Sequence, residues 1–200
     1  MPRSLADLVV IAIPFKRSFK DPWQYHRQIQ TILAATDDTS RLILCSSTSV
    51  YPMENQIASE EDELTPHNER AKVLLAVEAL ILERDGVVIR LGGLIGPNRD
   101  PAKFLAAKGL IDGADIPVNL IHLDDALGIL EFCIENRLAS EIINAVHPAH
   151  PSKADFYTRV AQQSAQSAPQ FSDQRQIPYK EVSAARIQAL GYAFKRPALY

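Results

Sequence analysis

Short apolar runs alternate along the chain with longer segments in which apolar residues recur at helical spacing. Short apolar runs between polar residues are typical of strands buried on both faces of a sheet. The predicted strands are Leu8–Ile13, Leu42–Cys45, Val87–Leu91, Val118–Leu123 and Glu141–Val146. Because helical segments separate these strands, the pattern predicts an α/β fold with a parallel sheet and right-handed crossovers.

The helical segments begin at residues that suit a helix N-terminus. A capping side chain followed by proline marks two starts, and Ser152 with Asp155 matches a capping box. The predicted starts are Asp21-Pro22, Thr65-Pro66, Asp124 and Ser152. The second helix should run to about Glu83, and its apolar stripe should contain Val73, Leu74, Val77, Leu80 and Ile81. Two more helices are expected, at Pro101–Lys108 and near Lys180–Leu190, where Gly191 ends the chain's last helix.

The order of these elements favours one domain over all 200 residues. Residues 1–96 should form the sheet core. Residues 97–120 and 145–200 should form a small lobe on the substrate side.

Composition narrows the range of partners. A net charge of −3 gives no basic surface for nucleic acid or for an anionic membrane. Cys45 and Cys133 lie in apolar runs and suit free thiols in a reducing compartment, and no signal peptide is visible, so we expect a cytoplasmic protein. The acidic run Glu60–Glu63 is typical of a solvated loop. The two histidines of His147–His150 alternate with prolines and favour a rigid loop, so no metal site is expected.

The segment Arg41–Pro52 carries the first candidate chemistry. Its strand ends in four hydroxyl residues, Ser46-Ser47-Thr48-Ser49. Ligands of open α/β sheets bind just beyond the carboxyl ends of the strands, so these hydroxyls could contact a ligand. The same residues could instead only cap the strand end through local hydrogen bonds.

Five landmarks follow one another along the chain. They are Ser46–Tyr51, the helix that carries Lys72, Arg90–Pro97, His122–Ala126 and Ile142–Ala145. This ordered set resembles the extended and atypical short-chain dehydrogenase/reductase proteins, which include the NAD-dependent epimerase/dehydratases. The resemblance covers nearly the whole chain and implies a Rossmann-like sheet that binds NAD or NADP.

The resemblance implies a catalytic set with one substitution. Ser47 matches the hydroxyl that orients the substrate, and Lys72 matches the lysine that lowers the pKa of a catalytic tyrosine. The tyrosine position, four residues before Lys72, is Asn68, and an amide cannot give and take a proton near neutral pH. Tyr51 matches a position that packs beside the site.

Further site residues follow from the same resemblance. The implied cofactor-binding residues are Ala12, Ile13, Pro14, Ser46, Lys72, Gly92, Gly93 and Leu94. The implied substrate-binding residues are Thr48, Gly93 and His122.

The glycine-rich turn that holds the pyrophosphate in this family has no counterpart in the chain. By the resemblance, Leu8–Ile13 is the fourth strand of the parent sheet, and the first three strands are missing. We therefore expect weak NAD(P) binding or none by this chain alone. We also expect a homodimer, because the edge of Leu8–Ile13 should be covered by a second copy.

Three readings stay open. The chain could belong to an epimerase, dehydratase or reductase that needs the missing glycine-rich part. It could be a non-catalytic binding or regulatory protein with a ligand cleft. It could also be a truncated product without a ligand.

Overall fold

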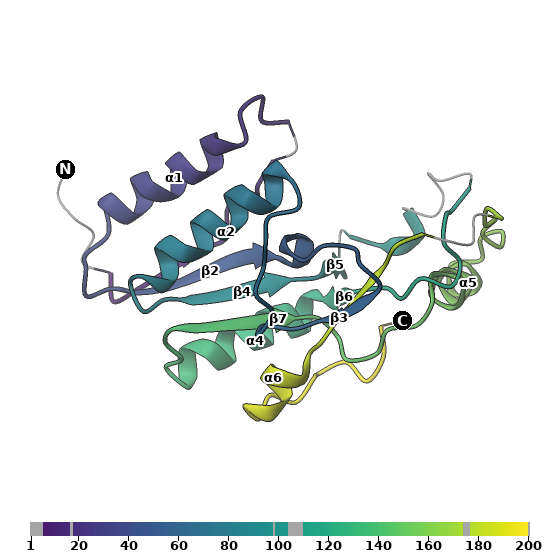
Figure 1. The fold of residues 1–200 in the computed structure, drawn as a ribbon. Coiled ribbons are helices and arrows are strands. Elements are labelled where there is room, and N and C mark those ends of the chain that lie inside the picture. Colours follow the sequence, from purple (N-terminus) through teal and green to yellow (C-terminus); the bar gives the residue numbers. More distant parts are fainter. Residues whose placement is uncertain (1–5, 17, 98, 104–109, 174–176, 200) are drawn as a thin grey trace.

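The computed structural model describes residues 6–16, 18–97, 99–103, 110–173 and 177–199. A parallel sheet with the strand order β1-β2-β4-β7 forms the centre of the molecule (Figure 1). Its strands are β1 (Leu8–Ile11), β2 (Arg41–Ser47), β4 (Val87–Leu91) and β7 (Glu141–Ala145). The predicted α/β class with a parallel sheet is confirmed.

Helices cover both faces of this sheet (Figure 1). They are α1 (Trp23–Ala34) and α2 (Glu69–Leu82) on one face, and α4 (Leu123–Glu135) and the short α6 (Ala185–Ala189) on the other. Each strand is followed by a segment that crosses a face before the next parallel strand, as parallel pairing requires. All four strands therefore end at the same edge of the sheet.

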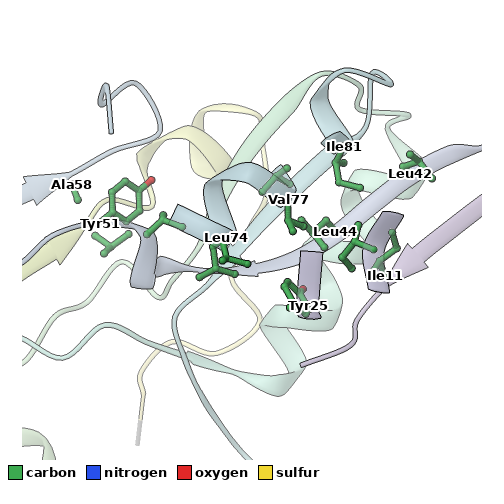
Figure 2. Packing of buried hydrophobic residues seen from close by; sticks show 14 of the residues in the cluster. Ile11, Tyr25, Leu42, Leu44, Tyr51, Ala58, Leu74, Val77 and Ile81 are labelled. Carbon is green, nitrogen blue, oxygen red and sulfur yellow. The ribbon is translucent and has the colours of Figure 1, made fainter. Parts of the chain in front are cut away.

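The larger core lies between the sheet and helices α1 and α2. Figure 2 shows side chains from the strands, such as Ile11 and Leu44, packed against Leu74 and Val77 of α2. A second core joins β4 and β7 to α4, α6 and Tyr192. These apolar contacts fix the positions of α2 and α4 relative to the ends of the strands, where the candidate site lies.

Two short parallel strand pairs form separate two-stranded sheets. They are β5 (Gly93–Ile95) with β6 (Leu120–His122), and β3 (Gln56–Ala58) with β8 (Lys180–Val182). Helix α5 (Lys153–Gln163) packs near the first pair through Phe156 and Val160. The capping box is confirmed: the Ser152 hydroxyl accepts from the Asp155 N–H at 3.0 Å and donates to its carboxylate at 2.8 Å.

Two predicted helix starts are wrong by a few residues. Helix α2 begins at Glu69, because the Asn68 side chain accepts from the Ala71 N–H at 2.8 Å and so caps the helix. Helix α4 is capped by His122, whose Nδ1 accepts from the Asp124 N–H at 3.1 Å.

The prediction of a final helix over Lys180–Leu190 is also wrong in its first part. Lys180–Val182 forms β8, and the helix covers only Ala185–Ala189. The side-chain amide of Asn119 donates to the Lys180 carbonyl and accepts from the Val182 N–H, both within 2.8 Å. This long-range pairing, which the local pattern does not contain, holds the segment extended.

Other boundaries differ slightly. Strand β1 ends at Ile11, so Ala12–Pro14 form a loop, and β6 is shorter than the predicted strand Val118–Leu123. Of the helix expected over Pro101–Lys108, residues 101–103 are helical and the rest lie outside the described residues.

The acidic segment differs from its prediction. Glu60 is buried, and its carboxylate accepts from the Asn144 N–H at 2.7 Å on the outer edge of β7. The adjacent Glu61 pairs with Arg186. The segment therefore closes an edge of the sheet instead of lying free in solvent. Within the described ranges, no helix has the length and apolar character needed to cross a membrane.

A candidate site at the carboxyl ends of the strands

A cavity of about 620 Å³ opens at the carboxyl ends of β1, β2 and β4. The loop after β1, the end of β2 and the turn after β4 form three of its sides, and α2 and α4 form the others. This is the edge at which open α/β sheets bind their ligands. Its volume lies within the range of about 300–1,000 Å³ that is usual for small-molecule sites.

Eight of the predicted site residues line this cavity. They are Ala12, Ile13, Pro14, Ser46, Ser47, Gly92, Gly93 and Leu94. They come from three segments that are distant in sequence. The parallel register of β1, β2 and β4 brings these segments together.

Lys72 does not line the cavity. Its side chain is exposed, and its ammonium lies 5.9 Å from the ring centre of Trp23 in α1. Asn68, in the implied tyrosine position, uses its side-chain oxygen to cap α2. We expected Ser47 and Lys72 to face one crevice. Ser47 lines the cavity and Lys72 does not, so this expectation is wrong.

The residues of α2 that line the cavity are Arg70 and Leu74. They are four residues apart, one helical turn, which is also the spacing of the expected tyrosine and lysine. The two α2 residues that face the strand ends are thus each two positions later in the sequence than the expected pair, Asn68 and Lys72. Neither residue can donate and take back a proton as a tyrosine–lysine pair does.

Arg70 is held in place by an aromatic pair. Its guanidinium lies 4.5 Å from the centre of the Phe15 ring and donates to the Phe15 carbonyl at 3.2 Å. Phe15 in turn stacks on Tyr25 with ring centres 5.0 Å apart and an angle of 2° between the planes. All three side chains line the cavity and form one wall of it.

Tyr25 lies at the cavity, but its chemistry does not suit proton transfer. Its hydroxyl donates to the Ile13 carbonyl, and burial raises the pKa of Tyr25 to about 12. A tyrosine that acts as a base near neutral pH needs a lowered pKa instead.

Gly92 and Gly93 allow close packing at the floor of the cavity. Their N–H groups donate to the carbonyls of Ala145 and Asn119 at 3.0 and 2.8 Å. A Cβ at Gly92 would lie 2.9 Å from the Asn119 oxygen, so a larger residue does not fit. These glycines therefore let the turn after β4 pack closely against Asn119, and their N–H groups are bonded within the protein.

The hydroxyl segment is held by one local hydrogen bond and by several long-range ones. The Ser47 oxygen accepts from the Ser49 N–H at 3.2 Å, the capping role that the sequence left open. The Thr48 side chain is buried, and its carbonyl accepts from the Lys180 ammonium at 2.7 Å. Of the four hydroxyl residues, only Ser46 and Ser47 line the cavity.

A buried network of charged and polar side chains contacts the cavity residue Ser46. The Ser46 hydroxyl donates to the Glu78 carboxylate at 2.5 Å, and that carboxylate pairs with the Arg90 guanidinium at 2.8 Å. Arg90 also donates to the Tyr51 hydroxyl, which donates to the Asn144 side-chain oxygen, each at 2.8 Å. Tyr51 is fully buried, so it is held by this network and does not reach the cavity.

The side-chain accessibilities of Arg90 and Glu78 are 4% and 3%. Burial alone would lower the pKa of Arg90, but the hydrogen bonds and charge of Glu78 outweigh it and raise that pKa. Burial raises the pKa of Tyr51. The Glu78–Arg90 pair was not among the residues predicted from the sequence. Its signal was a carboxylate one turn after Leu74 in an apolar helix, together with a lone arginine in the strand Val87–Leu91.

His122 lies at a second cavity of about 510 Å³, beside α5 and the C-terminal segment. Its ring caps α4 and lies 3.3 Å from the Asp124 carboxylate. A hydrogen bond from Arg196 holds the pKa of Asp124 below its usual value. His147 and His150 accept from or contact backbone groups, and no cluster of metal-binding side chains occurs among the residues that the structure describes.

The fold and the cavity define the chain as a Rossmann-type protein with the architecture of NAD-dependent epimerase/dehydratases. MoeE5 in complex with UDP-glucose and NAD superposes with a TM-score of 0.76 at 19% identity, over 96% of this chain and 75% of MoeE5. UDP-glucuronic acid 4-epimerase from Bacillus cereus, in complex with NAD, superposes with a TM-score of 0.75 at 18% identity, over 95% of this chain and 70% of that enzyme. No family model matches the chain.

The chain belongs to the same family as Protein YeeZ of Escherichia coli strain K12. The two are 31% identical over 199 residues, which are 96% of this chain and 72% of YeeZ. Protein YeeZ of E. coli O157:H7 gives the same values. The epimerase/dehydratase-type resemblance expected from the five landmarks is confirmed at the level of the fold.

Proposed function

We propose that the cavity at the ends of β1, β2 and β4 binds the nicotinamide end of NAD or NADP. The observation that carries the proposal is that seven of the eight residues expected to contact this cofactor, all but Lys72, line a single cavity of suitable volume. Solved structures that share the fold include proteins in complex with NAD.

The binding should be weak for the dinucleotide as a whole. A glycine-rich turn that opens a helix and offers free N–H groups to the pyrophosphate does not occur in the described part of the chain. The N–H groups of Gly92 and Gly93 are already bonded within the protein. We therefore propose that the nicotinamide ring contacts the cavity and that the adenine ring does not.

We propose that the protein binds this ligand without tyrosine–lysine proton transfer. Arg70 and Leu74 occupy the cavity side of α2, and Tyr25 has a raised pKa. This favours a binding or regulatory protein over a reductase. An epimerase or dehydratase that receives its proton-transfer group from elsewhere is the second candidate, supported by the shared architecture.

Saturation-transfer NMR with NAD⁺ tests this function. The nicotinamide protons should receive saturation from the protein, and the adenine protons should receive much less. The variant Ala12→Trp fills the cavity from an exposed position and should abolish the effect. The matched variant Ala34→Trp, on the exposed side of α1, should keep it. Stronger saturation of adenine, or none at all, would refute the proposal.

His122 and Thr48 were expected to contact the substrate. We propose that His122 does so from its separate cavity, in which Arg196 and Lys103 also lie. The small lobe of this proposal comprises residues 97–120 and 145–200, which include α5. Because Thr48 is buried and outside both cavities, it does not enter the proposed substrate site.

We also propose that β1 is covered by a second copy of the chain. Among the described strands β1 pairs only with β2, and Val10 in its middle is 38% exposed. Open apolar edges recruit further strands. Light scattering should give a dimer that Val10→Lys weakens, and a monomer at micromolar concentration would exclude this arrangement. The two free cysteines suit a reducing, cytoplasmic setting.

A further inference from the structure

The cavity carries positive charge that the nicotinamide ring does not need. Two arginines line it, Arg70 from α2 and Arg99 from the turn after β5. No aspartate or glutamate lies among the described residues that line it. A cleft of one charge sign, with walls of low polarity, concentrates ligands of the opposite charge.

The two arginines differ in how firmly the surrounding protein holds their side chains. Arg70 is fixed by its stack on Phe15 and by its hydrogen bond to the Phe15 carbonyl. Arg99 is exposed at the rim, where its N–H donates to the Gly96 carbonyl at 2.9 Å and closes a tight turn. One guanidinium is thus preorganised, and the other can adjust to a ligand. Both present the planar set of N–H donors that binds phosphate well.

Most other side chains around the cavity are apolar. They include Ile89, Leu91, Leu94, Leu123, Leu127 and Leu130. Arg70 and Arg99 are therefore charged groups in a largely apolar enclosure, which strengthens their attraction for an anion compared with water.

Because both arginines line one largely apolar cavity, we infer that Arg70 and Arg99 form a phosphate-binding subsite. It takes the phosphate group of the ligand. The inference rests on the proposed function for the rest of the ligand, because the same cavity would hold the nicotinamide ring. The ligand class is then a phosphorylated nicotinamide nucleoside, with the phosphate between the two guanidiniums.

Inorganic pyrophosphate tests the subsite without the nicotinamide ring. Isothermal titration calorimetry should detect its binding to the wild type. Arg99→Gln and Arg70→Gln should each weaken binding about tenfold or more, the effect of losing one charge-assisted hydrogen bond. Arg27→Gln removes the same charge from a side chain that is 59% exposed on α1 and should change nothing. Absence of pyrophosphate binding, or equal binding by all four proteins, would overturn the inference.

Arg70→Gln could unfold locally, because Arg70 packs on Phe15. Arg70→Lys keeps the charge and should retain much of the binding, and Arg99→Gln alters only an exposed side chain. Circular dichroism of each variant verifies its fold before titration. If Arg99→Gln is folded and binds pyrophosphate as well as the wild type, Arg99 has no part in a phosphate subsite and the inference fails.

A second pair of titrations separates the two proposals. Nicotinamide mononucleotide should bind about tenfold more tightly than nicotinamide riboside, which lacks the phosphate, and Arg99→Gln should remove that difference. Equal affinities would contradict the phosphate subsite and leave the nicotinamide proposal standing. Binding of pyrophosphate without any binding of riboside or mononucleotide would refute the nicotinamide proposal and leave the phosphate subsite standing.

Discussion

Removal of the Glu78 carboxylate should destabilise the protein more than any surface change. In Glu78→Ala, the Arg90 guanidinium would stay buried without its charged partner, and Ser46 would lose the acceptor of its hydroxyl. Loss of one member of a buried ion pair costs about 3–5 kcal/mol. Since domains are stable by about 5–15 kcal/mol, the variant should lose a large part of its free energy of unfolding.

The double variant Glu78→Met/Arg90→Met separates charge from packing. It removes both charges and keeps most of the side-chain volume, so it leaves no buried unpaired ion. Replacement of a buried pair by apolar residues is often nearly neutral. The double variant should therefore recover most of the stability lost in Glu78→Ala, although Ser46 would still lack its acceptor.

Urea unfolding followed by circular dichroism measures these differences. Glu78→Ala should shift the midpoint to lower urea with little change in slope, because the surface exposed on unfolding is nearly the same. Glu83→Ala, at the exposed end of the same helix, is the control and should change stability by less than about 0.5 kcal/mol. A loss below about 1 kcal/mol in Glu78→Ala, or a double variant less stable than it, would refute the reasoning.

Three further predictions concern single residues. Asn68→Ala should lower the free energy of unfolding by about 1 kcal/mol and Asn68→Asp should preserve it, since the side chain caps α2; urea unfolding measures both. Burial lowers the pKa of Lys180 to about 8, so the unfolded chain binds more protons above that pH. The stability of the wild type relative to Lys180→Met should therefore rise from pH 8 to pH 10, and a flat difference would contradict this. Burial raises the pKa of the Cys45 thiol at the cavity wall, so its alkylation by iodoacetamide should be slow near pH 7, speed up with pH, and slow again when nicotinamide mononucleotide is bound, as mass spectrometry can follow.

Much of the sheet could be predicted from local pattern. The runs Leu42–Cys45 and Val87–Leu91 are apolar and short, and both became central strands. The place of the site followed as well, because parallel strands end at one edge and Ser46 and Gly92 follow two of them. Such features depend on residues that are close together in the sequence, and a local sequence pattern records these residues.

The orientation of α2 could not be predicted in the same way. Its buried residues are Ala71, Val73, Leu74, Val77, Glu78 and Ile81. They lie on one side of the helix, but Leu75, Ala76, Ala79 and Leu82 are apolar residues on its other side, so the apolar pattern alone does not mark the side that meets the strand ends. A spacing of four residues fits Asn68 with Lys72 as well as Arg70 with Leu74. Only packing against β2 and β4 selects the second pair.

Polar residues that pair across long sequence distances were also invisible to the pattern. Glu60 accepts from the Asn144 N–H, and Asn119 holds β8 through two backbone hydrogen bonds. In sequence, Glu60 belongs to an acidic run and Lys180–Val182 adjoins a helical segment. Glu60 is buried because a backbone N–H on the outer edge of β7 needs an acceptor. Lys180–Val182 is extended because Asn119 pairs with its backbone groups, which also need partners.

The most direct measurement of the central claim is a titration of ¹⁵N-labelled protein with nicotinamide mononucleotide, followed by amide chemical shifts. The account predicts that the largest changes fall on Ala12–Phe15, on Ser46 and Ser47, and on Gly92–Leu94, at the ends of three parallel strands. Changes confined to the cavity around His122, or no changes at millimolar ligand, would contradict it.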